Sequence, residues 1–205
     1  MAQAYYKYIY PNFHVVEAEK WLEYDLGNGN QLIGIADGIA DDGHIVEHKT
    51  CASEITEQYE YNLLWDEQIL AYMLMTGMRK VWYTVCRKPT IRQKQNESEE
   101  EFYHRMIAWY DEDTDSKIRL LESERTDDEV EQFRQELMQM LDTMQICEAN
   151  RDNNPLNFYR NTCHCNMWGK RCEYSSICMH YDPDQPNVEF IKEDKPYGTE
   201  ENRSE

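Results

Sequence analysis

Apolar and polar residues alternate in short runs along the first fifty positions, which is the pattern of strands that bury one face. Strand segments are predicted at residues 13–18, 20–24, 31–37 and 44–50. Residues 27–30 (Gly-Asn-Gly-Asn) are a strong turn signal. An Asp-Asp-Gly turn at 41–43 separates the last two segments, so these are predicted to pair as an antiparallel hairpin.

Longer segments carry apolar residues at helical spacing. Helices are predicted at residues 53–76, 98–110 and 126–147. The first ends at Gly77. Ser98 and Thr126 each stand three residues before a Glu, the capping-box pattern that opens a helix.

Two further strands are predicted in the middle of the chain. Residues 80–86 are rich in Val, Trp and Tyr, and a short strand is predicted at 117–121. Strands and helices intermixed around one sheet predict an α/β fold. The chain is predicted to consist of a core (1–158), a Cys-rich segment packed on it (159–181) and a flexible acidic tail (182–205).

Composition narrows the class of protein. Hydrophobic residues make up 40% of the 205 positions, which is too many for a disordered chain. There is no run of about 18 apolar residues that would cross a membrane. The N-terminus lacks the charged and apolar regions of a signal peptide. We therefore expect a cytoplasmic protein without a membrane partner.

The charge balance opposes binding to nucleic acid. Forty acidic and 21 basic residues give a net charge of −19, and such a field repels a phosphate backbone. A DNA enzyme of this composition needs local basic patches and bound divalent cations. The most basic stretch offers Arg87, Lys88, Arg92 and Lys94 as phosphate contacts, and the alternative is a solvated loop.

A pair of acids on the predicted hairpin carries the clearest chemistry. Asp37 is followed after nine intervening residues by Glu47, and Lys49 shares the face of Glu47 on the second strand. Two adjacent carboxylates repel each other unless a cation lies between them, and hard oxygen ligands suit Mg²⁺ or Mn²⁺. A metal held by Asp37 and Glu47, with the His48 carbonyl as a further ligand, would polarise a phosphate and acidify a bound water. Lys49 would position that water or neutralise charge on the phosphate.

The same three residues also fit a turn Asp and an exposed charge pair, because this spacing is common by chance. However, both acids lie in or at the end of apolar strands, where an unpaired charge is costly. That context favours the metal site.

Three segments together resemble the RecB-like branch of the PD-(D/E)XK nucleases. They are 34–37 (Gly-Ile-Ala-Asp), 45–50 (Ile-Val-Glu-His-Lys-Thr) and 68–72 (Gln-Ile-Leu-Ala-Tyr). They match the G-x-x-D, E-x-K and Q-x-x-x-Y motifs of that branch in order and separation. The resemblance implies a restriction-endonuclease-like core, with a central mixed sheet flanked by helices. It implies catalytic Asp37, Glu47 and Lys49, and DNA backbone contacts from Gln68 and Tyr72.

The cysteines suggest a second metal site. Four of the seven fall between 163 and 178, and in a cytoplasmic protein such a cluster more often binds metal than forms disulfides. The C-x-Y-x-x-x-C element at 172–178 resembles the late element with which part of the RecB-like branch holds a [4Fe–4S] cluster. By that resemblance Cys165, Cys172 and Cys178 are three of the four thiolate ligands required.

The fourth ligand departs from the family pattern, because no Cys precedes the acidic motifs. Cys163 or Cys51 would replace it, or the site would hold zinc completed by His164 or His180. A set of reduced structural thiols is the remaining alternative. The resemblance favours iron–sulfur over zinc, with Cys163, Cys165, Cys172 and Cys178 as the ligands.

The N-terminus is a second departure. The family normally begins with a helix that precedes the first strand and supplies a further acidic or His residue. Here the first strand is predicted to begin so early that this helix is expected to be missing. Glu17 then lies either near the site or on the surface. A missing helix, or one supplied by a second chain, would put catalysis in doubt without changing the fold.

Three hypotheses for function follow. The first is a metal-dependent DNA nuclease, by resemblance an exonuclease in recombination, repair or phage DNA metabolism, with a helicase or recombinase partner and a homo-oligomer both open. The second is an inactive nuclease-fold module retained for DNA binding or assembly. The third is a metal-binding interaction protein with structural carboxylates. The intact set of motif residues favours the first.

Overall fold

The computed structural model describes residues 1–150, 162–166, 170–175 and 178. The chain divides into two compact units, Met1–Glu136 and Leu137–Glu205. The predicted boundaries at 158/159 and 181/182 both fall inside the second unit and stay predictions. The predicted tail, 182–205, lies outside the described residues.

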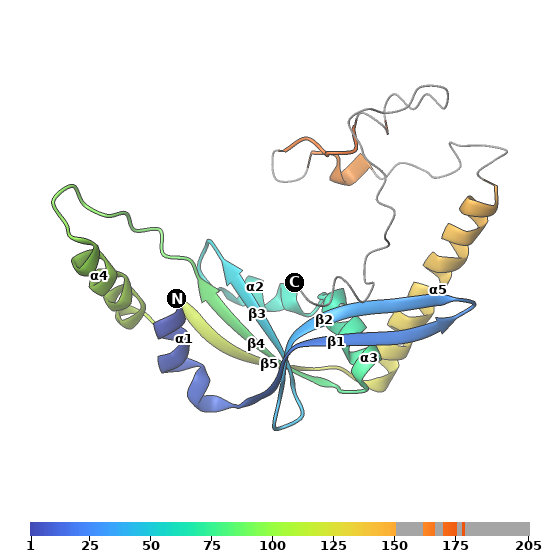
Figure 1. Cartoon of the computed structure of the whole chain (residues 1–205), viewed down its shortest axis with the longest axis horizontal. Coiled ribbons are helices and arrows are strands. Elements are labelled where there is room, and N and C mark those ends of the chain that lie inside the picture. The colour runs from blue at the N-terminus through green and yellow to red at the C-terminus, as the bar shows by residue number, and fades with distance from the viewer. Residues whose placement is uncertain (151–161, 167–169, 176–177, 179–205) are drawn as a thin grey trace. The chain divides into compact units, whose positions relative to one another are not determined.

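The first unit is built on one five-stranded sheet whose strands follow one another in chain order (Figure 1). Neighbouring strands run antiparallel, except that β3 and β4 are parallel. The predicted mixed sheet is therefore confirmed. Its strands are β1 Val15–Gly27, β2 Asn30–Ala40, β3 Ile45–Cys51, β4 Lys80–Arg87 and β5 Ile118–Glu124.

Strands β1 and β2 form a long hairpin that closes at the predicted turn. Gly27, Asn28 and Gly29 have φ angles of 83°, 54° and 79°, the left-handed region that Gly and Asn adopt most easily. The segments predicted at 13–18 and 20–24 are one continuous strand, with Glu19 at φ 47° between them.

The parallel pair β3–β4 requires a crossover connection, which two helices provide. They are α2 (Glu57–Leu63) and α3 (Glu67–Thr76). The single helix predicted over 53–76 is therefore wrong. The helix is interrupted because Asp66 caps a new one. The side-chain carboxylate of Asp66 accepts a hydrogen bond from the backbone amide of Gln68.

The predicted capping boxes are both present. They open α4 (Glu99–Glu112) and α5 (Asp127–Ala149). The Ser98 hydroxyl accepts the Glu101 amide at 3.2 Å, while the Ser98 amide donates to the Glu101 carboxylate at 2.8 Å. Thr126 and Glu129 repeat this arrangement at 3.2 and 2.7 Å.

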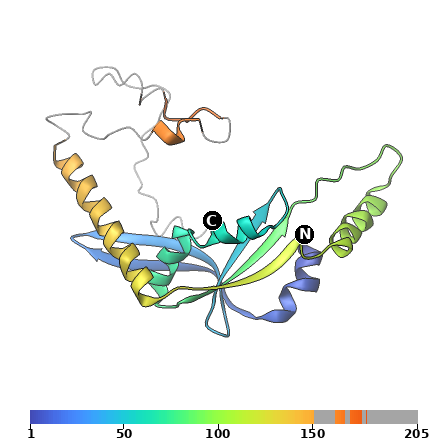
Figure 2. The same cartoon turned by 180° about the vertical axis from the view of Figure 1, so that it is seen from behind.

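Apolar side chains pack on both faces of the sheet. Successive side chains of β3 point to opposite faces. Ile45 packs with Ile69 of α3, whereas Val46 packs with Ala4 of α1 and Tyr110 of α4. Figure 2 shows the same layers from behind. Because the strand alternates in this way, Glu47 and Lys49 lie on the α3 face, while His48 lies on the α1 face.

The expected absence of a helix before the first strand is wrong. Helix α1 (Ala2–Tyr8) and a short 3-10 turn (Tyr10–Asn12) precede β1. The helix is fixed to α4, where Lys7 and Tyr8 both bond to Asp111. It contains no Asp, Glu or His. Glu17, in β1, pairs with Lys20 at 2.6 Å and is half exposed.

Among the described helices, none combines the length and apolar character needed to cross a bilayer.

The core makes a direct prediction for stability. Ile69 is fully buried between α3 and the sheet. Because truncation leaves a cavity, Ile69→Ala is expected to lower the free energy of unfolding by about 3 kcal/mol in urea denaturation. Ile146→Ala makes the same truncation at an exposed position of α5 and should change it by less than about 0.5 kcal/mol. Equal losses in the two variants would contradict the described core.

Candidate active site

The candidate centre lies where the hairpin of β2 and β3 opens. Backbone pairing between these strands reaches Gly38 and Val46. Continuing that register by one residue sets Asp37 opposite Glu47, on the same face of the sheet. At this point the His48 amide donates a 2.7 Å hydrogen bond to Asp37 Oδ2. The structure thus brings together the two predicted carboxylates.

Glu47 carries a buried carboxylate, with only 4% of the residue exposed. Its Oε1 lies 2.8 Å from Lys49 Nζ, whereas Oε2 has no hydrogen-bond partner among the described residues. Burial raises the pKa of Glu47, Lys49 opposes that rise, and the nearby carboxylates of Asp37 and Asp66 add to it. A buried, unpartnered carboxylate oxygen is costly, so it marks a position suited to a cation.

Lys49 is surrounded by three oxygen acceptors. Its Nζ lies 2.8 Å from Glu47 Oε1, 3.2 Å from Asp66 Oδ2 and 2.8 Å from Gln68 Oε1. These match the three N–H donors of an ammonium group. Burial by itself lowers the pKa of Lys49, but the carboxylates of Glu47 and Asp66 outweigh it, and the pKa is raised. Lys49 is therefore held in its charged form.

Gln68 and Tyr72 continue this network into the sheet. The Gln68 side chain accepts from Lys49 through its oxygen and donates from its nitrogen to the Tyr72 hydroxyl at 2.9 Å. The Tyr72 hydroxyl donates to the carbonyl of Ile35 in β2 at 2.6 Å. Tyr72 is 6% exposed. Both residues therefore orient Lys49, and their direct contact with DNA stays a prediction.

Asp66 is a member of the site that the motif analysis missed. One oxygen of its carboxylate caps α3, and the other faces Lys49 and accepts from the Tyr83 hydroxyl at 3.3 Å. Burial first, and then the Asp66 charge, raises the pKa of Tyr83, which keeps this donor protonated. The sequence signal that could have identified Asp66 is an Asp directly before Glu67 and Gln68, which is typical of a helix N-cap. It was overlooked because residues 53–76 were predicted as one helix.

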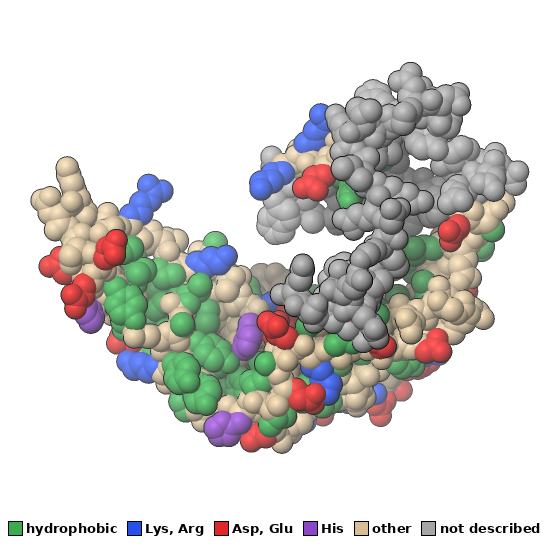
Figure 3. All heavy atoms as spheres, in the orientation of Figure 1, with side chains coloured by type: hydrophobic (Ala, Val, Ile, Leu, Met, Phe, Trp, Pro, Cys, Tyr) green, Lys and Arg blue, Asp and Glu red, His purple; other side chains and the backbone are tan. Residues whose placement is uncertain are grey.

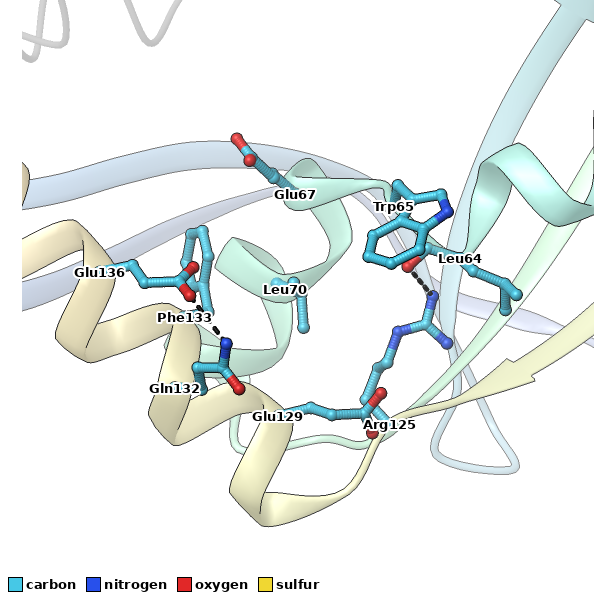
Figure 4. Close-up of a pocket in the computed structure, with 9 residues that line it drawn as sticks. All are labelled: Leu64, Trp65, Glu67, Leu70, Arg125, Glu129, Gln132, Phe133 and Glu136. Atoms are coloured by element: carbon cyan, nitrogen blue, oxygen red, sulfur yellow. Dashed lines mark hydrogen bonds between the residues drawn. The ribbon is translucent and has the colours of Figure 1, made fainter.

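Arg125 stabilises the segment between α2 and α3 that places Asp66 beside Lys49. This Arg is 5% exposed and donates to the carbonyls of Leu63 and Leu64 at 3.2 and 3.1 Å. Figure 4 shows it beneath Trp65, beside a cavity of about 400 Å³ between α3 and the start of α5. The lining of this cavity includes none of the motif residues. The cavity is therefore not the candidate active site.

The carboxylates outnumber the cation. Glu47 and Asp66 contact Lys49, and Asp37 lies near enough to Glu47 to raise its pKa. Three carboxylates and one ammonium leave two formal negative charges uncompensated. Within the described part of the chain, no group of three or more His, Cys, Asp and Glu side chains could hold a metal by itself. Mg²⁺ does not require one, because it binds through one or two carboxylates and keeps several waters. The donors present therefore fit Mg²⁺ or Mn²⁺.

His48 points away from this cluster. Its ring lies edge-on to Tyr5 of α1 at 5.4 Å, and its Nδ1 bonds the hydroxyl of Thr84 in β4. Burial lowers the pKa of His48, while the charge of Asp37 opposes that effect. Its side chain is thus structural, and only its backbone faces the carboxylates.

The predicted phosphate contacts fall into two groups. The Arg87 guanidinium lies 3.4 Å from Glu54 and over the ring of Trp109, and it is mostly buried. Lys88 and Arg92 are exposed. Lys94 is exposed as well, so the structure leaves three of the four predicted cations available at the surface.

The predicted cluster ligands belong to the second unit. Cys163, Cys165 and Cys178 are exposed and Cys172 is half buried. The Cys172 amide donates to the Cys165 carbonyl at 3.0 Å, which brings the two backbone segments together. Within the described residues these cysteines do not form a metal-binding group, so the iron–sulfur or zinc site stays a prediction. The alternative ligand His180 lies outside the described residues.

Two variants separate the roles of Asp66. Asp66→Asn keeps a capping side chain and removes the charge beside Lys49, whereas Asp66→Ala removes both. We expect Asp66→Ala to lower the free energy of unfolding by about 1 kcal/mol through the lost cap, and Asp66→Asn to lower it by less than half of that. Urea denaturation at neutral pH measures both. Equal losses would show that the ion pair, and not the cap, stabilises the protein.

Both the sequence and the structure have counterparts among known proteins. The family model described as the PD-(D/E)XK nuclease superfamily matches residues 1–179. An alkaline exonuclease from Laribacter hongkongensis is a similar solved structure, at 15% sequence identity and a TM-score of 0.41, covering 76% of this chain and 71% of that chain. No curated protein matches. Since the family model covers most of the sequence, the chain belongs to the PD-(D/E)XK nuclease superfamily.

Proposed function

We propose that this chain is a divalent-metal-dependent deoxyribonuclease with Asp37, Glu47 and Lys49 at its centre. The observation that carries the proposal is the buried Glu47 oxygen without a partner, beside a second carboxylate and a fixed ammonium. A structural ion pair satisfies its own charges. This cluster retains two negative charges and an unsatisfied oxygen, which a dication satisfies.

The metal ligands are Asp37, Glu47 and the backbone carbonyl of His48. When bound, Mg²⁺ or Mn²⁺ supplies Lewis-acid polarisation of the scissile phosphate and a water of lowered pKa. Glu47 presents its carboxylate from the sheet, where burial fixes its rotamer. Asp37 is oriented by the His48 amide, so both carboxylates are pre-set.

Lys49 supplies positive charge where negative charge develops on the phosphate. Its ammonium is held by Glu47, Asp66 and Gln68, so little reorganisation is required during the reaction. Gln68 and Tyr72 fix its direction and line the DNA side of the centre. Lys88 and Arg92, which follow the end of β4, are exposed and serve as backbone contacts without base specificity, whereas Arg87 is held by Glu54 and Trp109.

The resemblance supports an exonuclease that acts on linear ends in recombination, repair or phage DNA metabolism. A helicase or recombinase partner and a homo-oligomer are compatible with this assignment. In the second unit, Cys163, Cys165, Cys172 and Cys178 are proposed to hold a [4Fe–4S] cluster, with zinc as the alternative. No step of hydrolysis depends on that cluster.

The nuclease assignment is tested on end-labelled linear DNA. The purified protein is expected to degrade it with Mg²⁺ or Mn²⁺ and to stop when EDTA removes the metal. Lys49→Ala is expected to lower the rate by at least about a hundredfold, because it removes the charge that stabilises the transition state.

Lys80→Ala is the matched control, since Lys80 is a half-exposed β4 lysine near Glu122 and Glu124. It should retain activity within about twofold. Cleavage by Lys49→Ala at the wild-type rate would remove the proposed centre. A folded, metal-supplied wild type without activity would favour the inactive module.

The cysteine site is tested by elemental analysis. Protein purified without oxygen is expected to contain iron and acid-labile sulfide, and the double variant Cys172→Ala/Cys178→Ala to lose both. Cys86→Ala, at a buried Cys of β4, should retain them. Zinc without sulfide would replace the iron–sulfur assignment, and wild type without either metal would overturn it.

A further inference from the structure

The connection between β4 and α4 is fixed by one ion pair. Arg105 of α4 bonds both carboxylate oxygens of Glu97, through Nε to Oε1 and through Nη2 to Oε2, each at 2.7 Å. Only 9% of the Glu97 side chain is exposed. Bidentate pairs of this kind set geometry as well as adding energy. We call this pair the Glu97–Arg105 clamp.

The clamp holds the residues before it. Arg105 Nη2 also donates to the carbonyl of Arg92 at 2.9 Å. The Lys94 amide donates to Glu97 Oε2 at 2.9 Å, and the Gln93 side chain to the Glu97 carbonyl at 2.8 Å. Residues 92–94 have no regular secondary structure, yet every one of them is bonded to the clamp.

The cations of this loop are not neutralised. Lys88, Arg92 and Lys94 are exposed, and in the part of the chain that the structure describes no carboxylate forms an ion pair with them. Of the acids that follow, Glu97 is paired in the clamp and Glu101 caps α4, which leaves Glu99 and Glu100. In a chain of net charge −19, these three exposed cations have no ion pair among the described residues and outnumber Glu99 and Glu100, so the loop carries a local positive excess.

The loop begins where β3, the strand that carries Glu47 and Lys49, comes to its end. The Lys88 amide donates to the carbonyl of Cys51, two residues beyond Lys49. Because β3 and β4 are parallel, both strands end here. Figure 1 shows the connection leaving β4 toward α4, and Figure 3 shows blue side chains projecting from that region.

We propose that the Glu97–Arg105 clamp positions Arg92 and Lys94 to bind DNA phosphates beyond the scissile one. Glu97 and Arg105 are positioning residues, and Arg92 and Lys94 make the contacts. The proposal rests on DNA being the substrate, and it extends the substrate footprint from the centre toward α4. The loop is then the element that overcomes the repulsion of the acidic chain.

The direction in which Glu97→Gln changes DNA affinity distinguishes a positioning role of Glu97 from an effect of its negative charge alone. Glu97→Gln removes one negative charge, so the average field predicts slightly tighter DNA binding. Loss of the clamp predicts weaker binding, because Arg92 and Lys94 are no longer held. Glu131→Gln on α5 is the matched control, since Glu131 forms a similar bidentate pair with Arg134, at 2.8 and 2.8 Å, away from the loop.

Binding is measured with a fluorescein-labelled linear duplex in Ca²⁺ across a salt series, and KM and kcat are measured in Mg²⁺. Arg92→Ala/Lys94→Ala is expected to reduce the salt slope by about 0.9 per lost phosphate contact. Glu97→Gln and Arg105→Lys are expected to raise KM and weaken binding by about tenfold, with kcat within about twofold. Adding Glu97→Gln to Arg92→Ala/Lys94→Ala should weaken binding no further, because the clamp acts through those side chains.

Unchanged or tighter binding by both clamp variants, with folding intact by circular dichroism, would overturn the proposal. Additive losses in the combined variant would also overturn it, because they would assign Glu97 a role of its own. If Glu131→Gln weakened binding equally, the loop would have no special part. These outcomes are independent of cleavage: binding in Ca²⁺ tests the clamp even if the nuclease assay fails, and an active enzyme indifferent to the clamp leaves the proposed function standing.

Discussion

The rest of the site depends on one buried carboxylate. Glu47 lies within β3 and is almost fully buried, so its ionised carboxylate loses most of its hydration. Lys49 compensates one oxygen and is itself held by Asp66. Asp66 reaches that place because the chain breaks before α3, and Arg125 stabilises the break. The break between α2 and α3 prevents one long helix from forming. It places the Asp66 carboxylate beside Lys49, where it helps to stabilise the buried charges of the sheet.

Such an arrangement is poorly explained by stability alone. A buried ion pair contributes little net stability compared with apolar residues of similar volume. Here the pair is also incomplete, with an unpartnered Glu47 oxygen and more carboxylates than cations. Sites that violate the usual rules of burial are expected where function requires them. The proposed nuclease function would supply that requirement, because a metal and a phosphate would both meet these acids and the lysine.

The sequence was sufficient where local pattern determines structure. The hairpin, both capping boxes and the strand at 80–86 were predictable because each depends on neighbouring residues. Asp66 was not predicted because its role depends on an ion pair with Lys49, which lies seventeen residues earlier in the sequence. In addition, the helical spacing of apolar residues continues from Leu63 to Thr76, so the sequence pattern does not reveal the break. Helix α1 escaped because tertiary contacts to Asp111, and not a periodic pattern, hold it. Arg87 resembled its basic neighbours in sequence but is bound to Glu54 and Trp109.

The net charge of the chain is a poor guide to any single surface. Many described cations are matched locally, as Arg119 is by Glu60 and Arg79 by Asp127, so those pairs contribute little field at a distance. What a phosphate meets at close range is set by the charges left over. On the α3 face of the β2–β3 hairpin the excess is negative, which fits the proposed metal ion. Past the end of β4 it is positive, because the carboxylate of Glu97 is paired with Arg105 and that of Glu101 caps α4. Under the proposed function the two excesses are complementary, since a metal held by the carboxylates and the cations past the end of β4 would both attract the same phosphate backbone.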